Sequence, residues 1–269
     1  MLKVIPRKIT MPIPELGSNS LVKNNPVLSH FFNALSTLFP IGEAFFIASV
    51  KPFINNIKDE VLRKSAIDFI EQEKNHSYVH TILNRGLEKY NMKVRYKNQE
   101  FRTKKALRFY SSEFNLALTA GMEHLTATIG YVIIRGNYLN NVHVQVADLF
   151  YWHSLEELEH KSVVFNLFQE VDGTQWKLNL GMIIGSFMTY ITTLSRMVHF
   201  LHKDGLLFRF ATFKEILNLH ISQEGILRKC LPLTIDFFKP NFHPDQRDDF
   251  ELIADMENKL KGIFIVKEA

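Results

Sequence analysis

Four glutamates and three histidines occur at spacings that suit metal binding between α-helices. Glu73 is followed three residues later by His76, and Glu157 is followed in the same way by His160. Residues at this spacing are neighbours on one helical face. Two Glu-x-x-His pairs, each preceded by a helix with a lone glutamate, form the ligand pattern of di-metal carboxylate bundles. The predicted ligands are Glu43, Glu73, His76, Glu123, His153, Glu157 and His160.

The donor atoms of this set indicate which metals it would hold. Carboxylate oxygens and imidazole nitrogens suit iron or manganese and suit copper less well. Two cations that share bridging carboxylates would explain how four acids stay ionised together in an apolar core. The sequence therefore predicts two iron ions, with manganese or a mixed iron–manganese pair as alternatives. His153 lies one turn before Glu157 and would give one ion a further nitrogen, the alternative being a core histidine bonded to a carboxylate such as Glu156.

Other ionisable residues near the motifs are expected to contact the ligands without touching the metals, or to have no part in the site. Glu156 falls close to the ligand face of its helix, and His80 lies one turn beyond His76. Both can reach a ligand from outside, although His80 is equally well explained as a surface histidine. Glu159 is expected to face a neighbouring element or solvent, and His124 is expected to be structural.

The sequence predicts where the supporting helices begin and end. Pro40 is expected in the first turn of its helix, because proline is favoured there, and Asp59 is a good N-cap for the next helix. Asn140 and Asn141 form a turn, and the Asp172-Gly173 pair ends a later helix. The predicted helices cover about residues 40–57, 59–90, 103–138 and 141–171, with a polar connector over residues 91–99.

These helices define an all-α fold, a ferritin-like four-helix di-metal bundle with additional C-terminal helices. Within each predicted hairpin the two carboxylates lie about equally far from the turn, so a rise of about 1.5 Å per residue brings them to the same height. We expect an extended, proline-rich arm over residues 1–27 and a single helical domain over 28–269. Residues 28–172 would form the metal-binding core and 173–269 the covering helices, with breaks at Pro232 and over 239–244 and no strand pattern.

The composition excludes several other kinds of site. The chain has 269 residues, enough for one large helical domain, and its single cysteine, Cys230, excludes a disulfide scaffold and a cysteine-based metal site. A net charge of +4 gives no indication of nucleic-acid binding. The N-terminal region lacks the continuous apolar core of a signal peptide, so we expect a cytoplasmic protein.

One segment complicates this expectation. Residues 178–201 are largely apolar and long enough to approach a membrane span. Polar side chains interrupt them, and Arg196 would be costly in lipid, so we expect a buried helix of the bundle. The alternative is an amphipathic helix that docks the protein peripherally on the inner membrane, aided by a basic stretch that otherwise forms a solvated connector and helix start. That stretch contains Lys93, Arg95, Lys97, Arg102, Lys104, Lys105 and Arg108.

Five short motifs are similar to those of known helical metal proteins. They are Phe39-Pro40-Ile41-Gly42-Glu43, Gln72-Glu73-x-x-His76, Glu123-His124, Trp152-His153-x-x-Glu156-Glu157-x-Glu159-His160-Lys161 and Phe238-Lys239-Pro240-x-Phe242-His243-Pro244. Over about residues 28–245 the chain resembles the bacterial family catalogued as predicted metal-dependent hydrolases. The ligand set also resembles that of the di-iron arylamine N-oxygenases typified by p-aminobenzoate N-oxygenase. Both resemblances imply the same seven ligands.

The chain departs from the family pattern at two positions. Shortly after the last ligand histidine, family members commonly have aspartate and tyrosine, where this chain has Asn166 and Phe168. An acid that would orient a ligand histidine from outside is therefore expected to be missing, which would weaken the retention of iron.

Three functions remain open at this point. The first is a non-heme di-iron oxygenase or oxidase that activates dioxygen and oxidises a small organic substrate in the phenylalanine-rich interior, with an electron donor that the sequence does not identify. The second is a two-metal hydrolase, although helical metal hydrolases usually use more aspartate. The third is a non-catalytic, metal-binding, membrane-associated protein. A homodimer is an open alternative for the quaternary structure.

Overall fold

The computed structural model describes residues 2–14, 21–90, 92 and 96–266. Over these residues the chain is helical apart from one small two-stranded sheet, which confirms the all-α class. The shorter elements are the strands β1 (Arg7–Ile9) and β2 (Phe264–Val266) and the 3-10 helices η1 (Lys51–Asn56) and η2 (Pro244–Gln246). The α-helices are α1 (Pro26–Val50), α2 (Glu60–Lys89), α3 (Tyr96–Phe109), α4 (Ser112–Arg135), α5 (Val144–His160), α6 (Val163–Val171), α7 (Gln175–Lys203), α8 (Phe210–Ile221), α9 (Ile226–Asp236) and α10 (Phe250–Lys259).

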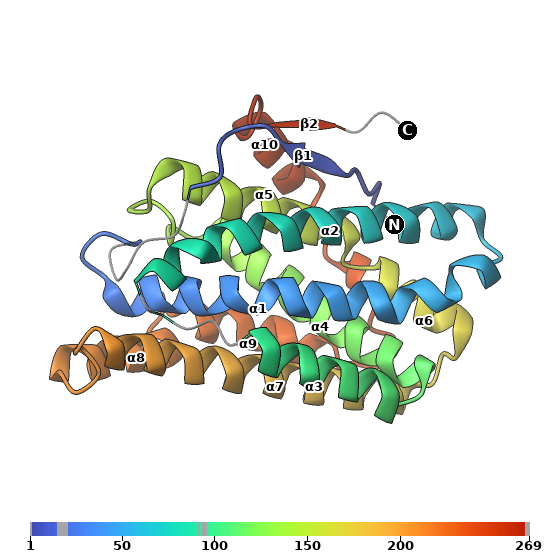
Figure 1. Cartoon of the computed structure of the whole chain (residues 1–269). Helices are drawn as coiled ribbons and strands as arrows, with labels where there is room; N and C mark the ends of the chain where they lie inside the picture. Colours follow the sequence, from blue (N-terminus) through green and yellow to red (C-terminus); the bar gives the residue numbers. More distant parts are fainter. Residues whose placement is uncertain (1, 15–20, 91, 93–95, 267–269) are drawn as a thin grey trace.

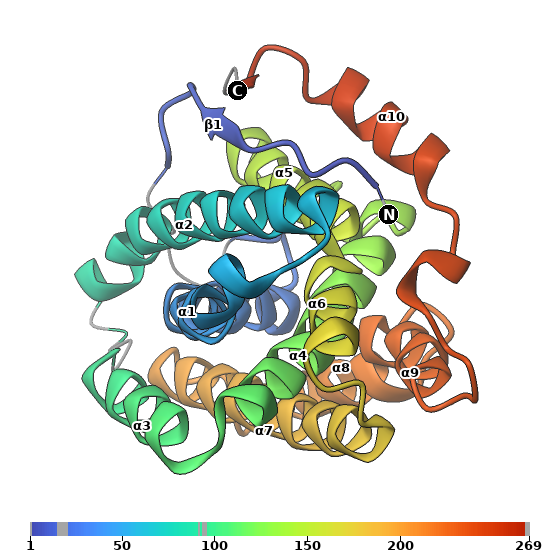
Figure 2. The same cartoon turned by 90° about the vertical axis from the view of Figure 1, so that its right-hand side faces the viewer.

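The helices α1, α2, α4 and α5 carry all the predicted ligands. The helix α1 contacts α2 and α4, and α5 contacts α2 and α4, so the four close around one interior. Figure 2 shows α1 almost end-on, with α2 and α5 on one side of it and α4 on another. The helix α7 packs against α1 and α4. The likeness to ferritin and the boundaries of arm, core and covering helices stay predictions.

Several predicted helix ends are confirmed by their caps. The Asp59 carboxylate accepts hydrogen bonds from the amides of Val61 and Leu62 and so begins α2. Gly173 follows the C-terminal end of the fourth predicted helix. Its φ of 69° is a left-handed conformation that glycine adopts without a steric penalty. The chain also turns at Asn140 and Asn141, as predicted.

The predicted position of Pro40 in a first turn is wrong, because Pro40 lies inside α1. A proline in a helix interior leaves the carbonyl four residues earlier without its usual donor. Here that carbonyl belongs to Ser36, and the Asn84 side-chain amide of α2 donates to it at 2.8 Å. A contact between two helices therefore replaces the missing bond and lets α1 continue through the proline.

Two other predicted helices are interrupted. The third predicted helix is split into α3 and α4 at Ser111, whose hydroxyl caps α4 by accepting from the Phe114 amide at 3.2 Å. The fourth is split into α5 and α6 at Lys161, a buried residue whose Nζ donates to the Asp249 carboxylate at 2.7 Å. The break predicted at Pro232 is also wrong, since this proline lies within α9. The break over residues 239–244 is confirmed.

The N-terminal arm contains a strand and a buried side chain that the sequence did not predict. The sequence shows no strand pattern, yet β1 pairs with β2 in antiparallel register, with Lys8 opposite Ile265. The side chain of Arg7 is fully buried, and α1 already begins at Pro26, inside the predicted arm. Some predictions lie outside the described residues: part of the arm (residues 1 and 15–20), part of the polar connector (91 and 93–95), and the side chains of Lys93, Arg95 and Lys97.

Three helical segments are long and apolar enough, by length and composition, to cross a membrane: Pro26–Asn56, Ser112–Arg135 and Gln175–Lys203. The first two are mostly buried within the protein. Only 28% of the most apolar stretch of the third, α7, is buried. The expectation that residues 178–201 form a buried helix is therefore wrong for most of that stretch.

Candidate metal centre

The predicted ligands meet in the interior between α1, α2, α4 and α5. Each of their side chains is at most 4% exposed. Each of the four ligand-bearing helices contributes at least one acid. The predicted ligands are Glu43 on α1, Glu73 and His76 on α2, Glu123 on α4, and His153, Glu157 and His160 on α5.

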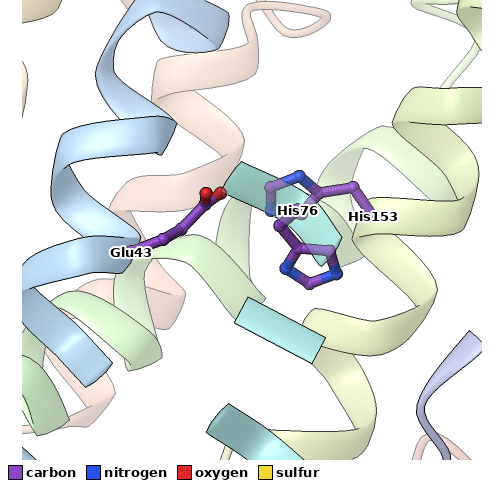
Figure 3. A group of neighbouring side chains, drawn as sticks. All are labelled: Glu43, His76 and His153. Carbon is purple, nitrogen blue, oxygen red and sulfur yellow. The ribbon is translucent and has the colours of Figure 1, made fainter. Parts of the chain in front are cut away.

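Their donor atoms form three overlapping groups, each with atoms within 4.8 Å of one another. Figure 3 shows one group, in which Glu43, His76 and His153 point toward one another from three helices. A second group contains Glu73, Glu123 and His160. A third joins Glu73, His76 and Glu157, and it shares Glu73 with the second group and His76 with the first. The three groups are therefore joined through one carboxylate, Glu73, and one imidazole, His76.

Many donor atoms in this cluster have no hydrogen-bond partner among the described residues. Buried polar atoms are almost always hydrogen-bonded, because losing water without compensation costs free energy. Here both oxygens of Glu43, Glu73 and Glu123 are buried and lack such a partner. Buried acceptor atoms that lack a hydrogen-bond donor can be satisfied by bound cations instead. The residues of this cluster therefore suit a pair of metal ions. The atoms that share this property are Glu43 Oε1 and Oε2, Glu73 Oε1 and Oε2, His76 Nδ1, Glu123 Oε1 and Oε2, Glu157 Oε2 and His160 Nε2.

The electrostatics of the cluster also favour added positive charge. Burial, followed by the neighbouring carboxylates, raises the pKa values of Glu43 and Glu73 well above the usual range. Burial likewise raises the pKa of Glu123 to about 7, although His160 opposes the shift. In the same interior, burial lowers the pKa of His76 to about 3. Glu157 and His160 shift the other way: against the burial penalty, His160 lowers the pKa of Glu157 well below its usual range, and Glu123 and Glu157 raise the pKa of His160 well above its usual range. The cluster thus combines carboxylates that resist ionisation with one imidazole that favours its charged form, and a bound cation would favour the ionised carboxylates instead.

A chain of hydrogen bonds determines which nitrogen of His153 faces the carboxylates. The Asn84 amide donates to Ser36 O, so Asn84 Oδ1 accepts from the Ser36 hydroxyl at 2.8 Å. The Ser36 oxygen can then accept from His80 Nδ1 at 2.9 Å. His80 Nε2 is left to accept from His153 Nδ1 at 2.7 Å. Burial lowers the pKa of His153 to about 4, so its Nε2 carries a lone pair.

That lone pair lies 2.9 Å from Glu157 Oε1. Two acceptors at this distance repel each other unless a proton or a cation lies between them. The alternative of a core histidine bonded to a carboxylate therefore stays open, with Glu157 and not Glu156 as that carboxylate, because the ring nitrogens of His153 face Glu157 and His80. The surface alternative for His80 is wrong, since His80 is fully buried.

The other two histidines are held from outside in the same manner. Gln72 Nε2 donates to Glu159 Oε2, which leaves its Oε1 to accept from His160 Nδ1 at 2.9 Å. His76 Nε2 lies 2.9 Å from Glu156 Oε2, as expected for a residue that contacts a ligand. Ligand histidines commonly bond a second group through their outer nitrogen, which fixes the ring.

The arm completes this outer layer. The backbone amide of Arg7 donates to Glu156 Oε1 at 2.9 Å, and its guanidinium donates to both oxygens of Glu159 at 2.8 and 2.6 Å. Glu159 therefore faces a neighbouring element. Neither Arg7 nor Gln72 was singled out from the sequence, although Gln72 stands in one of the quoted motifs.

Two further predictions concern residues away from the donors. His124 Nε2 bonds Leu233 O at 2.9 Å, in agreement with a structural role. Asn166, at the position of the expected acid, lies 2.7 Å from His243 Nε2 through its Oδ1. Asn166 replaces the acid that is common in the family at this position. The three predicted ligand histidines nevertheless have outer partners, because Gln72, Glu156 and His80 contact their rings.

A pocket of about 190 Å³, called the inner pocket below, reaches the cluster at Glu43 and Glu157. Its wall is mostly apolar, with threonines and Arg102 as the other polar groups. Gly42 contributes to this wall, and a Cβ at that position would meet no atom within 4 Å. The apolar residues of the wall are Leu35, Leu38, Phe39, Ile41, Phe46, Met122, Ile129 and Met188.

The fold and the site define an all-α protein with a buried cluster of carboxylates and imidazoles whose spacing suits a metal ion. The family model described as "Predicted metal-dependent hydrolase" matches residues 5–248, and the chain belongs to this family. The match begins within the arm and includes Arg7. No curated protein and no solved structure matches the chain.

Proposed function

We propose that the seven predicted ligands hold two metal ions, iron or manganese, and that the protein uses them to oxidise a small organic substrate with dioxygen. The observation that carries this proposal is the set of buried donor atoms that lack a hydrogen-bond partner within the described part of the chain. A pair of redox-active ions supplies electrons that dioxygen needs before it reacts with an organic molecule. Four carboxylates and three imidazoles suit such ions.

The chain's own contribution is to orient the donors and to limit water. Gln72, Glu156 and His80 hold the three histidine rings, so each inner nitrogen faces the carboxylates. The rings are also packed by aromatic side chains: Phe39 lies 4.4 Å from His153 and Trp152 lies 4.9 Å from His76, centroid to centroid. A rigid, water-poor interior of this kind avoids reorganisation during a reaction.

The inner pocket supports oxidation of an apolar group more than hydrolysis. Its wall beside Glu43 and Glu157 is largely aliphatic and aromatic. Hydrolysis needs a water molecule at the reacting carbon or phosphorus and donors for the developing negative charge. The threonines and Arg102 are the polar groups that line this pocket apart from the two glutamates.

The family match favours hydrolysis as the second candidate function. A two-metal site can clamp and polarise a carbonyl or phosphoryl group. In that case the same seven residues would hold the ions, and an ester, amide or phosphoester would lie in the inner pocket. The two functions differ in whether dioxygen is consumed.

The test is to load the protein anaerobically with ferrous iron and then measure oxygen uptake with an electrode. In parallel, the manganese and zinc forms are assayed on p-nitrophenyl acetate and bis(p-nitrophenyl) phosphate. Oxygen uptake that depends on Glu123 supports the oxidase. Cleavage of either ester without oxygen uptake by the iron form would establish the hydrolase instead. Failure to bind either metal would overturn both.

A further inference from the structure

A second pocket adjoins the inner pocket. It has a volume of about 310 Å³, lies among residues of α1, α4, α7, α8 and α9, and is called the outer pocket below. Leu35, Ile129 and Thr189 line both pockets, and we call these shared residues the neck. The two pockets therefore adjoin at the neck, and the inner pocket is the one that also holds Glu43 and Glu157.

The outer pocket suits an apolar occupant. Its wall is dominated by aliphatic and aromatic side chains such as Phe31, Leu194 and Met197. Two polar groups in the wall are already paired, because the hydroxyl of Tyr190 lies 2.9 Å from His220 Nε2 and His220 Nδ1 bonds Ile216 O. A polar molecule would lose its hydrogen bonds to water here, whereas apolar surface gains about 25 cal/mol per Å² on burial.

A positively charged side chain, Arg228, lies at the solvent side of the outer pocket. Arg228 lines the pocket and is exposed, next to Leu231, of which 57% is exposed. One guanidinium nitrogen of Arg228 donates to Ile221 O at 2.7 Å, which holds the side chain at the end of α8. A guanidinium binds carboxylates and phosphates through paired hydrogen bonds. The pocket therefore has an apolar interior and a basic entrance.

We propose that the two pockets form one channel that binds a molecule with a single apolar chain and an anionic head. The head lies at Arg228, the chain passes the neck at Ile129, and the far end lies beside Glu43 and Glu157. This inference rests on the proposed function, because it names the substrate class of the same centre. The inner pocket alone is smaller than the roughly 300 Å³ of the smallest common ligand sites, and joined to the outer pocket it exceeds that size.

Gly42 offers a way to shorten the channel from its inner end. Gly42 lines the inner pocket and a Cβ there would meet no atom within 4 Å, so Gly42→Leu is expected to reduce the pocket without a backbone clash. Glycine in a helix interior is less favourable than alanine by about 1 kcal/mol, so a larger residue at this position of α1 should not weaken the helix. The position thus tests chain length separately from folding.

The experiment measures binding of linear alkyl carboxylates, from hexanoate to octadecanoate, by isothermal titration calorimetry with metal-free and metal-loaded protein. Affinity is expected to rise with chain length up to a limit in both forms, and Gly42→Leu is expected to lower that limit. Arg228→Gln should weaken binding of the carboxylates at least several-fold but not that of the matching alcohols. Lys229→Gln, at a neighbouring residue paired with Glu224, is the control and should bind like the wild type.

The outcomes separate this inference from the proposed function. Length-dependent binding that Gly42→Leu shortens supports the channel even if the loaded protein neither consumes oxygen nor cleaves esters. Absence of carboxylate binding in both metal states, or a length limit that Gly42→Leu leaves unchanged, would overturn the channel. Neither of these results would contradict the proposals of metal binding and oxygen uptake.

A second inference rests on a different observation, the exposed apolar side chains of α7 and α8. Phe208, in the turn between the two helices, is 90% exposed and Phe210, the first residue of α8, is 81% exposed, although large aromatic side chains are usually covered. The helix α3 borders this surface, because Arg102 and Met188 of α7 line one pocket. Figures 1 and 2 both show α3, α7 and α8 along one side of the molecule. We call this side the α3–α7–α8 face, and the exposed apolar residues of its three helices include Phe101, Trp176, Ile183, Phe187, Phe210 and Phe213.

We infer that the α3–α7–α8 face docks on an anionic lipid bilayer. Exposed cations lie among the apolar side chains on α3, namely Arg102, Lys104, Lys105 and Arg108. A helix that buries one face in the boundary of a bilayer combines apolar and aromatic residues with such cations, which attract anionic lipids. This placement keeps α1 and α4, the other two apolar helices, inside the protein with their glutamates.

The test compares sedimentation of the protein with phosphatidylcholine vesicles and with vesicles that also contain phosphatidylglycerol. The wild type should sediment with the anionic vesicles, and less so at high salt. Phe213→Glu should reduce the bound fraction several-fold. Phe250→Glu, an equally exposed phenylalanine on α10 at the opposite side of the molecule, should not. A wild type that ignores vesicles but forms a dimer that Phe213→Glu dissociates would overturn the inference.

Discussion

His80 Nε2 lies 2.7 Å from His153 Nδ1, and this contact joins a residue of α2 to a predicted metal ligand of α5. Its direction is set on α1, where the Ser36 hydroxyl donates to Asn84 and therefore accepts from His80. Ser36 also supplies the carbonyl that Pro40 leaves without a helical donor, and Asn84 satisfies it. The proline within α1 and the orientation of His153 thus depend on the same two side chains.

Replacing His80 should weaken metal binding without unfolding the protein. His80→Phe keeps an aromatic ring beside Phe39, whose centroid lies 4.6 Å away, but removes the acceptor for His153. Loss of such an outer contact typically costs about 10–100-fold in metal affinity, which competition with a chelator would measure. His124→Phe, another buried histidine, is the control and should bind metal normally. Equal losses in both variants would show that His80 acts only through packing.

Removal of His153 tests its role as a ligand. Its ring stacks on His76 at a centroid distance of 4.1 Å and contacts Phe39, so phenylalanine should fit the same space. We expect His153→Phe to keep the fold and most of the metal but to change the visible spectrum of a cobalt-substituted form, because one ion loses a nitrogen donor. If the spectrum is unchanged and a metal-bound structure places His153 more than about 4 Å from either ion, near twice a normal metal–nitrogen bond, then His153 is a core residue.

Glu123→Gln should have opposite effects on the metal-free and metal-loaded proteins. In the metal-free form Glu123 is buried, and its Oε2 lies 3.0 Å from His160 Nε2 without the geometry of a hydrogen bond. A neutral amide removes the cost of burying that charge, so the melting temperature should stay equal or rise. Elemental analysis should show at least one ion lost per chain. Glu113→Gln in the first turn of the same helix is the control. A lower melting temperature without metal loss would refute the assignment.

The helices and the ligand set could be predicted because local signals encode them. The spacing of Glu73 and His76 places both on one face of a helix wherever that helix packs, and Asp59 acts through amides two and three residues away. Such relationships need no knowledge of the tertiary structure. The structure brings the predicted ligands into one buried cluster, and their role as metal ligands stays a prediction.

The errors arose where distant residues decide the outcome. Pro40 reads as a helix start until Asn84, on another helix, satisfies the freed carbonyl. Arg7 lies in a segment without periodicity, and its partners are separated from it by more than a hundred residues. Likewise, the apolar composition of α7 predicts burial, whereas only 28% of its most apolar stretch is buried. Composition alone does not distinguish a buried helix from one that has an uncovered face.

Loss of the Arg7 guanidinium should destabilise the protein strongly. Its side chain is fully buried and pairs with both oxygens of Glu159, itself only 2% exposed. Removing one partner of a buried ion pair leaves the other charge uncompensated, at a cost of about 3–5 kcal/mol. Arg7→Met should lower the free energy of unfolding by this amount in urea titrations, and Lys8→Met, an exposed neighbour in β1, should not. Similar values for the two variants would mean that the arm contributes little.

The stability of the metal-free protein should fall as the pH rises from about 7 to 8. Burial raises the pKa of Glu123 to about 7 and that of Glu156 to about 8, so the folded state holds protons that the unfolded state has already released. Stability that depends on such protons is present at lower pH and is lost as the pH passes the folded-state values. Burial lowers the pKa values of His76 and His153 to about 3 and 4, and these two shifts affect the stability of the metal-free protein mainly at lower pH.

Metal should reverse this trend. Bound cations replace the protons on the carboxylates, so metal affinity rises with pH. The difference in melting temperature between the manganese-loaded and metal-free proteins should therefore widen from pH 7 to 8, as measured by differential scanning calorimetry. Glu123→Gln should flatten the slope of the metal-free protein, because the amide does not titrate. A metal-free protein that becomes more stable over this range, with a constant increment from metal, would mean that these carboxylates are already ionised in the folded state.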